Sequence, residues 1–103
     1  MPTWHLIATV EQCPPGEARE FVVEDRIVAL FQVEGRFYAL DGICPHQGGP
    51  LGRGRLCGEL VTCPWHGWQF DVVTGRHQAN PALQQSRFSV KIEGQNIFVA
   101  VTE

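Results

Sequence analysis

Two short segments each combine a thiol with an imidazole: Cys44-Pro45-His46 and, after sixteen residues, Cys63-Pro64-Trp65-His66. Each segment therefore offers one soft sulfur ligand and one nitrogen ligand that are close along the chain. Two such loops at the ends of neighbouring strands can converge on one site. Thiolates suit zinc, copper(I) and iron–sulfur clusters, whereas imidazole suits zinc, copper and iron. The residue types predict a metal centre but do not name the metal.

The stretch that contains both segments, residues 42–67, differs in composition from the rest of the chain. It holds seven of the eleven glycines, three of the seven prolines, two of the four histidines and three of the four cysteines. Glycine permits positive φ and close backbone approach, while proline fixes φ and removes a hydrogen-bond donor. Together with the cysteines and histidines, this composition distinguishes the stretch from a plain linker.

The elements that must position these loops are β-strands. Short runs rich in Val, Ile and Phe predict strands at residues 4–10, 20–23, 26–33, 36–40, 60–62, 68–72, 88–92 and 97–101. Glu34-Gly35 and Gly94-Gln95 lie between such runs and predict hairpin turns. No window suits an amphipathic helix of three turns. We therefore expect an all-β antiparallel sandwich or small barrel.

Length and charge narrow the class of protein. With 103 residues, 44% of them hydrophobic, the chain suits one compact domain over residues 1–103. A net charge of −3 without a basic stripe argues against nucleic-acid binding. The apolar runs are far shorter than a membrane span, and the N-terminus lacks a signal-peptide pattern. We expect a cytoplasmic protein, in which four cysteines indicate metal binding or reactivity rather than disulfides.

The segments Cys44-Pro45-His46-Gln47-Gly48-Gly49-Pro50-Leu51 and Cys63-Pro64-Trp65-His66-Gly67-Trp68-Gln69-Phe70-Asp71 resemble the two cluster-binding boxes of Rieske [2Fe–2S] proteins. Pro81 falls where this family often has a proline-containing loop against the cluster. The resemblance covers essentially the whole chain. It implies a Rieske-type fold, in which a cluster-binding subdomain of about residues 41–83, formed by two loops, is inserted in the β base.

The resemblance also implies a ligand set, with one [2Fe–2S] cluster per chain. Cys44 and Cys63 would bind one iron, and His46 and His66 the other. Replacing two thiolates by neutral imidazoles makes an added electron easier to accept, so Rieske centres have higher potentials than all-cysteine clusters. A structural zinc site uses the same four ligands and stays open as an alternative, which an absorption spectrum would separate.

Within the family, the residues near the boxes predict a low reduction potential. Quinol-oxidising members join the two loops by a disulfide, but the matching positions here are Gly49 and Trp65. Those members also donate hydrogen bonds to the sulfurs from a serine and a tyrosine, whose places are taken by Trp68 and Phe70. A phenyl ring donates no hydrogen bond. We expect a potential on the order of −150 mV, and a titration above about +100 mV would contradict this.

The short chain and low-potential pattern resemble a Rieske-type ferredoxin of aromatic-ring dioxygenase systems. Such a protein is not itself an enzyme: it shuttles electrons from a flavin-containing, NADH-dependent ferredoxin reductase to a terminal oxygenase. Gln47, Trp65 and Pro81 would form the docking rim, and Trp65 and Trp68 would shield the cluster from water. The interface would be small and transient, and we expect a monomer.

Two other functions use the same residues. A Rieske-like small subunit of an assimilatory NADH-dependent nitrite reductase is also short, but such subunits often lack some ligands and all four are present here. An oxygenase would need a second, mononuclear iron, for which only His5 and His77 remain. We expect these two histidines to be structural or at the surface, and Cys57 to be a small buried residue.

Overall fold

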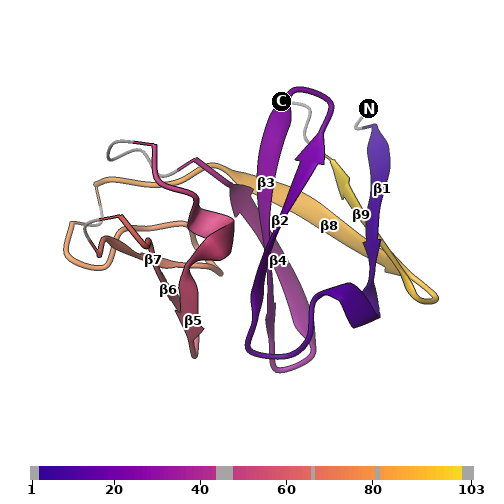
Figure 1. The fold of residues 1–103 in the computed structure, drawn as a ribbon, viewed down its shortest axis with the longest axis horizontal. Helices are drawn as coiled ribbons and strands as arrows, with labels where there is room; N and C mark the ends of the chain where they lie inside the picture. The colour runs from indigo at the N-terminus through magenta and orange to yellow at the C-terminus, as the bar shows by residue number, and fades with distance from the viewer. Residues whose placement is uncertain (1–2, 44–47, 66, 81, 101–103) are drawn as a thin grey trace.

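The computed structural model describes residues 3–43, 48–65, 67–80 and 82–100. Within them the chain forms nine strands and two short 3₁₀ turns (Figure 1). The strands are β1 (Trp4–Thr9), β2 (Ala18–Val23), β3 (Arg26–Val33), β4 (Arg36–Asp41), β5 (Arg55–Cys57), β6 (Leu60–Thr62), β7 (Gln69–Asp71), β8 (Arg87–Glu93) and β9 (Asn96–Ala100), and the turns are η1 (Val10–Gln12) and η2 (Leu51–Arg53).

Six strands form one antiparallel sheet in the order β1-β9-β8-β4-β3-β2, and β5, β6 and β7 form a second, smaller sheet. Figure 1 shows the small sheet at one end of the molecule and the large sheet at the other. The two edge strands of the large sheet, β1 and β2, lie close to each other. His5 Nε2 on β1 is 3.8 Å from Glu24 Oε2 in the turn after β2. The sheet thus closes almost into a barrel, which confirms the predicted all-β class.

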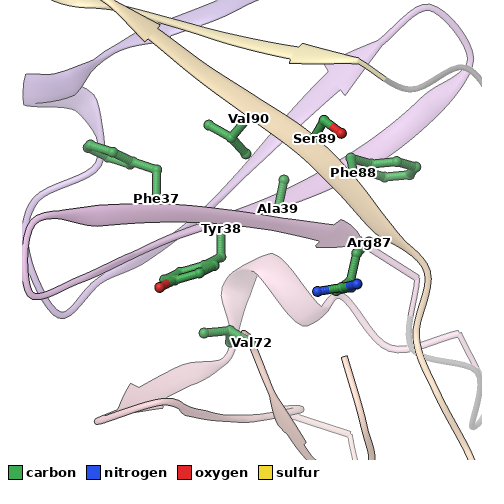
Figure 2. A pocket seen from close by; sticks show the side chains of 8 residues that line it. All are labelled: Phe37, Tyr38, Ala39, Val72, Arg87, Phe88, Ser89 and Val90. Atoms are coloured by element: carbon green, nitrogen blue, oxygen red, sulfur yellow. The ribbon is translucent and has the colours of Figure 1, made fainter. Parts of the chain in front are cut away.

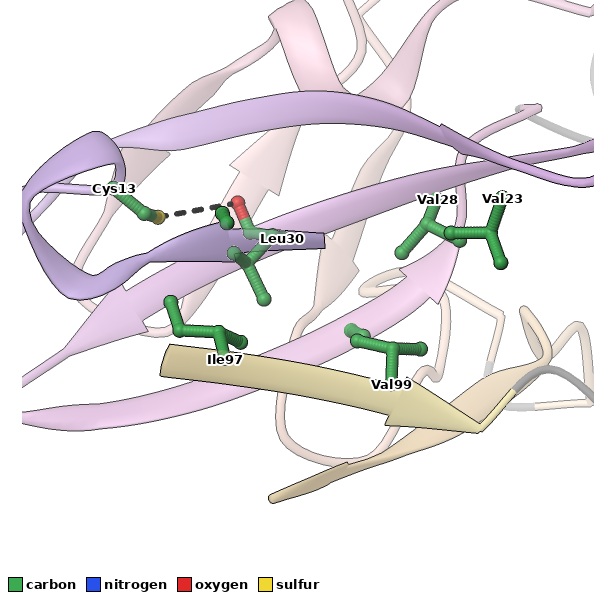
Figure 3. Packing of buried hydrophobic residues seen from close by; sticks show 8 residues of the cluster. Cys13, Val23, Val28, Leu30, Ile97 and Val99 are labelled. Atoms are coloured by element: carbon green, nitrogen blue, oxygen red, sulfur yellow. Dashed lines mark hydrogen bonds between the residues drawn. The ribbon is translucent and has the colours of Figure 1, made fainter. Parts of the chain in front are cut away.

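The interior of this barrel is packed with aliphatic side chains around Cys13. Figure 3 shows Cys13 beside Leu30, with Val28 on the same strand and Ile97 and Val99 facing them from β9. The thiol is fully buried and donates a hydrogen bond to the Leu30 carbonyl oxygen, with an Sγ–O distance of 3.7 Å. Burial raises the pKa of the Cys13 thiol to about 11, so it stays neutral and serves the core.

Strand β3 contributes to two cores at once. Because side chains alternate along a strand, Val28 and Leu30 point into the barrel, while Phe31 points to the opposite side. There Phe31 packs in a second core with Leu40 of β4 and with buried residues of the small sheet. Both faces of β3 are buried, which explains its unbroken apolar run. The second core contains Ala29, Phe31, Leu40, Leu51, Val61, Cys63, Phe70 and Val72.

A cavity of about 420 Å³ lies beside the junction of β4 and β8. Figure 2 shows Tyr38 and Arg87 on the side of this junction that faces Val72, with Phe37, Ala39 and Val90 on the other side. Arg87 Nη1 donates to the Val73 carbonyl oxygen at 3.0 Å. This bond ties the large sheet to the residues that follow β7.

The structure corrects two expectations. Strand β5 was not predicted, because its residues Arg55, Leu56 and Cys57 include none of the Val, Ile or Phe that indicated the other strands. Cys57, expected to be buried, is exposed at the end of this strand, before the turn into β6.

Among the described residues, no helix is long and apolar enough to cross a bilayer.

Candidate metal centre

The described part of the chain contains one of the four predicted ligands, Cys63. Of the residues predicted to surround the centre, it contains Trp65 and Trp68. The remaining candidates, Cys44, His46, Gln47, His66 and Pro81, lie outside the described residues. The geometry of the site is therefore built from Cys63 and from the backbone that leads into and out of the two loops.

Cys63 begins a tight turn directly after β6. Its backbone N–H donates to the Trp68 carbonyl oxygen at 2.7 Å, which closes the loop over the intervening residues. Gly67 in this loop has φ +73°, a left-handed conformation that glycine adopts without steric cost. The Cys63 side chain is 1% exposed and forms no disulfide. A buried free thiol at the end of a strand is thus held where the sequence predicted a sulfur ligand.

The first loop passes directly against this thiol. A Cβ atom added to Gly49 would lie 2.5 Å from Cys63 Sγ and 3.0 Å from Trp65 Cβ, so only glycine allows this approach. Segments fourteen residues apart in sequence therefore meet at one point, which is the convergence that the two-loop pattern requires. The same contact brings together Gly49 and Trp65, the two positions where quinol-oxidising relatives were expected to carry a disulfide.

Hydrogen bonds fix both ends of the first loop. Gly42 accepts from the Leu51 N–H at 2.9 Å, and Ile43 and Pro50 face each other in an isolated β-bridge. The Ile43 N–H also donates to Asp41 Oδ1 at 3.0 Å. The backbone on each side of Cys44 and His46 is thus tied together.

Behind the second loop, the His77 ring packs edge to face against two other aromatic rings. The His77 ring meets the Trp68 ring at a centroid distance of 4.6 Å and the Phe70 ring at 5.2 Å, both at 86°. His77 Nδ1 accepts hydrogen bonds from the N–H groups of Ala79 and Asn80, both at 3.1 Å. The ring proton therefore lies on Nε2. This buried Nε2–H has no hydrogen-bond partner among the described residues.

Three exposed apolar side chains lie in the two loops or in the segment that follows β7. Trp65, which the sequence analysis predicts to be part of a docking rim, is 49% exposed. Sequence reasoning missed two further exposed residues, Ile43 at the start of the first loop and Leu83 in the segment after β7. It also missed Gln85, whose buried amide hydrogen-bonds to the first loop. A lone Ile, Leu or Gln has no sequence signature that distinguishes these roles.

The residues present fit an iron–sulfur centre. Cys63 offers a free, buried sulfur, and the glycine backbone beside it leaves space that any other residue would fill. The described residues contain no cluster of three metal-ligating side chains. Two thiolates with two imidazoles suit either a Rieske cluster or zinc, so the donor chemistry alone leaves both open.

Comparisons with known proteins resolve this choice. The family model described as the Rieske [2Fe-2S] domain matches residues 3–102. The ferredoxin component of a naphthalene 1,2-dioxygenase system from Pseudomonas aeruginosa is 36% identical over 97 residues, which cover 93% of each chain.

Two solved structures share the fold. One chain of the complex of reduced oxygenase and oxidised ferredoxin in carbazole 1,9a-dioxygenase is 28% identical, with a TM-score of 0.86 over 97% of this chain and 94% of that one. A Mycobacterium tuberculosis protein described as the small subunit of an NADH-dependent nitrite reductase has a TM-score of 0.89, over 100% of this chain and 98% of that one. Its 20% identity shows the fold alone. From the family model and the 36% identical relative, we conclude that the chain belongs to the Rieske [2Fe–2S] domain family, whose cofactor is a [2Fe–2S] cluster.

Proposed function

We propose that this chain is a one-electron carrier of a ring-hydroxylating dioxygenase system. It would take electrons from a flavin-containing, NADH-dependent ferredoxin reductase and deliver them to a terminal oxygenase, without catalysing a reaction itself. The main support is the likeness to a naphthalene dioxygenase ferredoxin component, which extends over 93% of both chains. A related chain is seen in a complex of an oxygenase with a ferredoxin. Conversion of the aromatic substrate then belongs to the partner.

We assign the ligands from the family pattern: Cys44 and Cys63 on one iron, and His46 and His66 on the other. When bound, the cluster accepts and releases a single electron. The protein holds the Cys63 sulfur in the second core and closes the loop around it through the Trp68 carbonyl oxygen. Residues of about 41–83 would act as the cluster-binding unit on the β base. Free thiols and an NADH-dependent partner fit a cytoplasmic location.

We expect the reduction potential to be low because Phe70 takes the position from which a tyrosine hydroxyl donates to sulfur in high-potential members. The Phe70 ring is fully buried at the position of the tyrosine of high-potential members, and it has no hydroxyl group. Gly49 and Trp65, which lie in contact, have no thiols to join. A spectroelectrochemical titration should give a value on the order of −150 mV. A value above about +100 mV would show that other groups stabilise the added electron.

Reconstituted turnover tests the carrier role directly. Purified protein is added to a candidate reductase and a ring-hydroxylating oxygenase, and NADH consumption and hydroxylated product are followed together. Product formation that depends on this chain is expected. If the protein delivered electrons to a nitrite reductase flavoprotein and to no oxygenase, the proposal would be wrong and the protein would be a nitrite reductase subunit. A colourless protein that contains zinc would overturn the carrier role altogether.

Trp65 should contribute to docking because its large ring is half exposed beside the converging loops. Central aromatic side chains often dominate the affinity of small interfaces. We expect Trp65→Ala to raise the KM of the oxygenase for the carrier about tenfold, or ~1.4 kcal/mol, with kcat retained. Leu6→Ala is the matched control, because Leu6 is also an exposed apolar residue but lies on β1 of the barrel. Equal KM values for both variants would place docking elsewhere.

A further inference from the structure

We infer that Gln85 is a positioning residue for the first cluster-binding loop: its side-chain amide holds the peptide carbonyl that immediately precedes Cys44. The inference rests on the proposed assignment of Cys44 as a ligand. It adds a residue from outside both boxes, about forty positions further along the chain, that would control the geometry of the sulfur side of the centre.

The contact is direct and buried. Gln85 is 6% exposed, and its Nε2 donates to the carbonyl oxygens of Asp41 at 2.7 Å and Ile43 at 2.5 Å. A primary amide nitrogen carries two hydrogens, so each carbonyl receives one. The Ile43 carbonyl belongs to the peptide group that joins Ile43 to Cys44. The orientation of this peptide plane fixes the direction in which the chain enters the first box.

Gln85 is itself held in place from the opposite side. Its backbone N–H donates to the Gly75 carbonyl oxygen at 2.7 Å. Gly75 has φ +82°, and a Cβ atom there would lie 2.5 Å from the Gln85 carbonyl oxygen, so the two backbones are packed in contact. The Gly75 N–H donates in turn to the Asp71 carbonyl oxygen at the end of β7. Gln85 therefore links the segment after the second box to the start of the first box.

Because Gln85 is buried, the loss of its hydrogen bonds should have a large effect on the first loop. Carbonyl groups that lose water must find other donors, and removal of a buried partner costs more than a surface hydrogen bond. The glycine-rich first loop has little intrinsic preference for one conformation, so ties at its ends select the conformation that it adopts. Residues that orient ligands from outside the coordination shell commonly change metal affinity roughly 10–100-fold when replaced.

The test uses the holoprotein and two substitutions of Gln85. Gln85→Met keeps the length of the side chain but removes both donors, and Gln85→Asn keeps the donors but is too short to reach both carbonyls. We expect Gln85→Met to lose its visible iron–sulfur absorption roughly tenfold faster in the presence of a chelator, with altered visible circular dichroism and a shifted reduction potential. Gln85→Asn should fall between Gln85→Met and the unsubstituted protein.

The neighbouring residue provides a matched control. Gln84 Nε2 donates to the Thr74 carbonyl oxygen at 2.9 Å from an exposed position, so Gln84→Met removes a similar bond that does not involve the first loop. This variant should keep the original rate of cluster loss, the spectrum and the potential. If Gln85→Met and Gln85→Asn only lower the melting temperature and leave those three readouts unchanged, Gln85 is merely structural. No reductase or oxygenase takes part, so failed turnover would overturn the carrier role and leave this inference intact.

Discussion

Replacement of Cys63 by serine is expected to remove nearly all iron and acid-labile sulfide from the purified protein and to abolish electron transfer. The Cys63 sulfur is buried in the second core directly beside the backbone of the first loop. A hydroxyl group is a much poorer ligand for iron–sulfur clusters than a thiolate. The barrel has its own core around Cys13 and should stay folded. Iron and sulfide analysis with far-ultraviolet circular dichroism would measure both effects.

The other cysteines provide controls for this result. Cys57 is exposed at the end of β5, so Cys57→Ser should retain the full iron content and normal stability. Cys13→Ala should also retain the iron, but it should lower the free energy of unfolding by about 1–2 kcal/mol because it leaves a small void in the barrel. If the Cys63→Ser protein retained normal amounts of iron and sulfide, the result would show that the centre does not lie at the two loops.

Gly49→Ala should also sharply impair the centre, although Gly49 is not a ligand. The added methyl group would meet Cys63 Sγ at 2.5 Å and Trp65 Cβ at 3.0 Å, so the two loops would have to separate. Overpacking of this kind costs about 1–3 kcal/mol, which corresponds to roughly one to two factors of ten in cluster affinity. The rate of absorbance loss under a chelator, compared with that of the unsubstituted protein, measures the change.

Gly58→Ala separates this steric effect from a general cost of replacing glycine. Gly58 has φ +61° in the turn between β5 and β6, and nothing lies within 4 Å of a Cβ atom there. The substitution should lower stability by about 1–2 kcal/mol through backbone strain and leave cluster retention unchanged. If the two variants lose their clusters at the same rate, the close approach at Gly49 has no special role.

The strands of the barrel could be predicted because their apolar patterns are local. The pattern at residues 26–33 marked β3 with its observed bounds. It could not show that the two faces of β3 belong to different cores, since that depends on segments far away in the chain. Strand β5 was missed because it exists only through its pairing with β6.

Candidate ligands could be proposed from the sequence where residue types carry a chemical signature. Cys63 has a thiol at family spacing, and the structure places it against the first loop. Gln85 is 42 residues from Ile43, to which it binds, and nothing in a glutamine marks such a partner. The environment of His77 likewise depends on how Trp68 and Phe70 fold onto it. Such contacts between distant segments are products of the tertiary fold.

The double role of β3 has a consequence for the speed of the proposed electron exchange. One strand is common to the barrel interior and to the packing around Cys63, so neither part can relax without disturbing the other. We therefore expect little movement of the atoms around Cys63 when the proposed centre changes its oxidation state. A low reorganisation energy speeds outer-sphere electron transfer over a given distance. A rigid centre would therefore need only a brief encounter with each redox partner to transfer an electron.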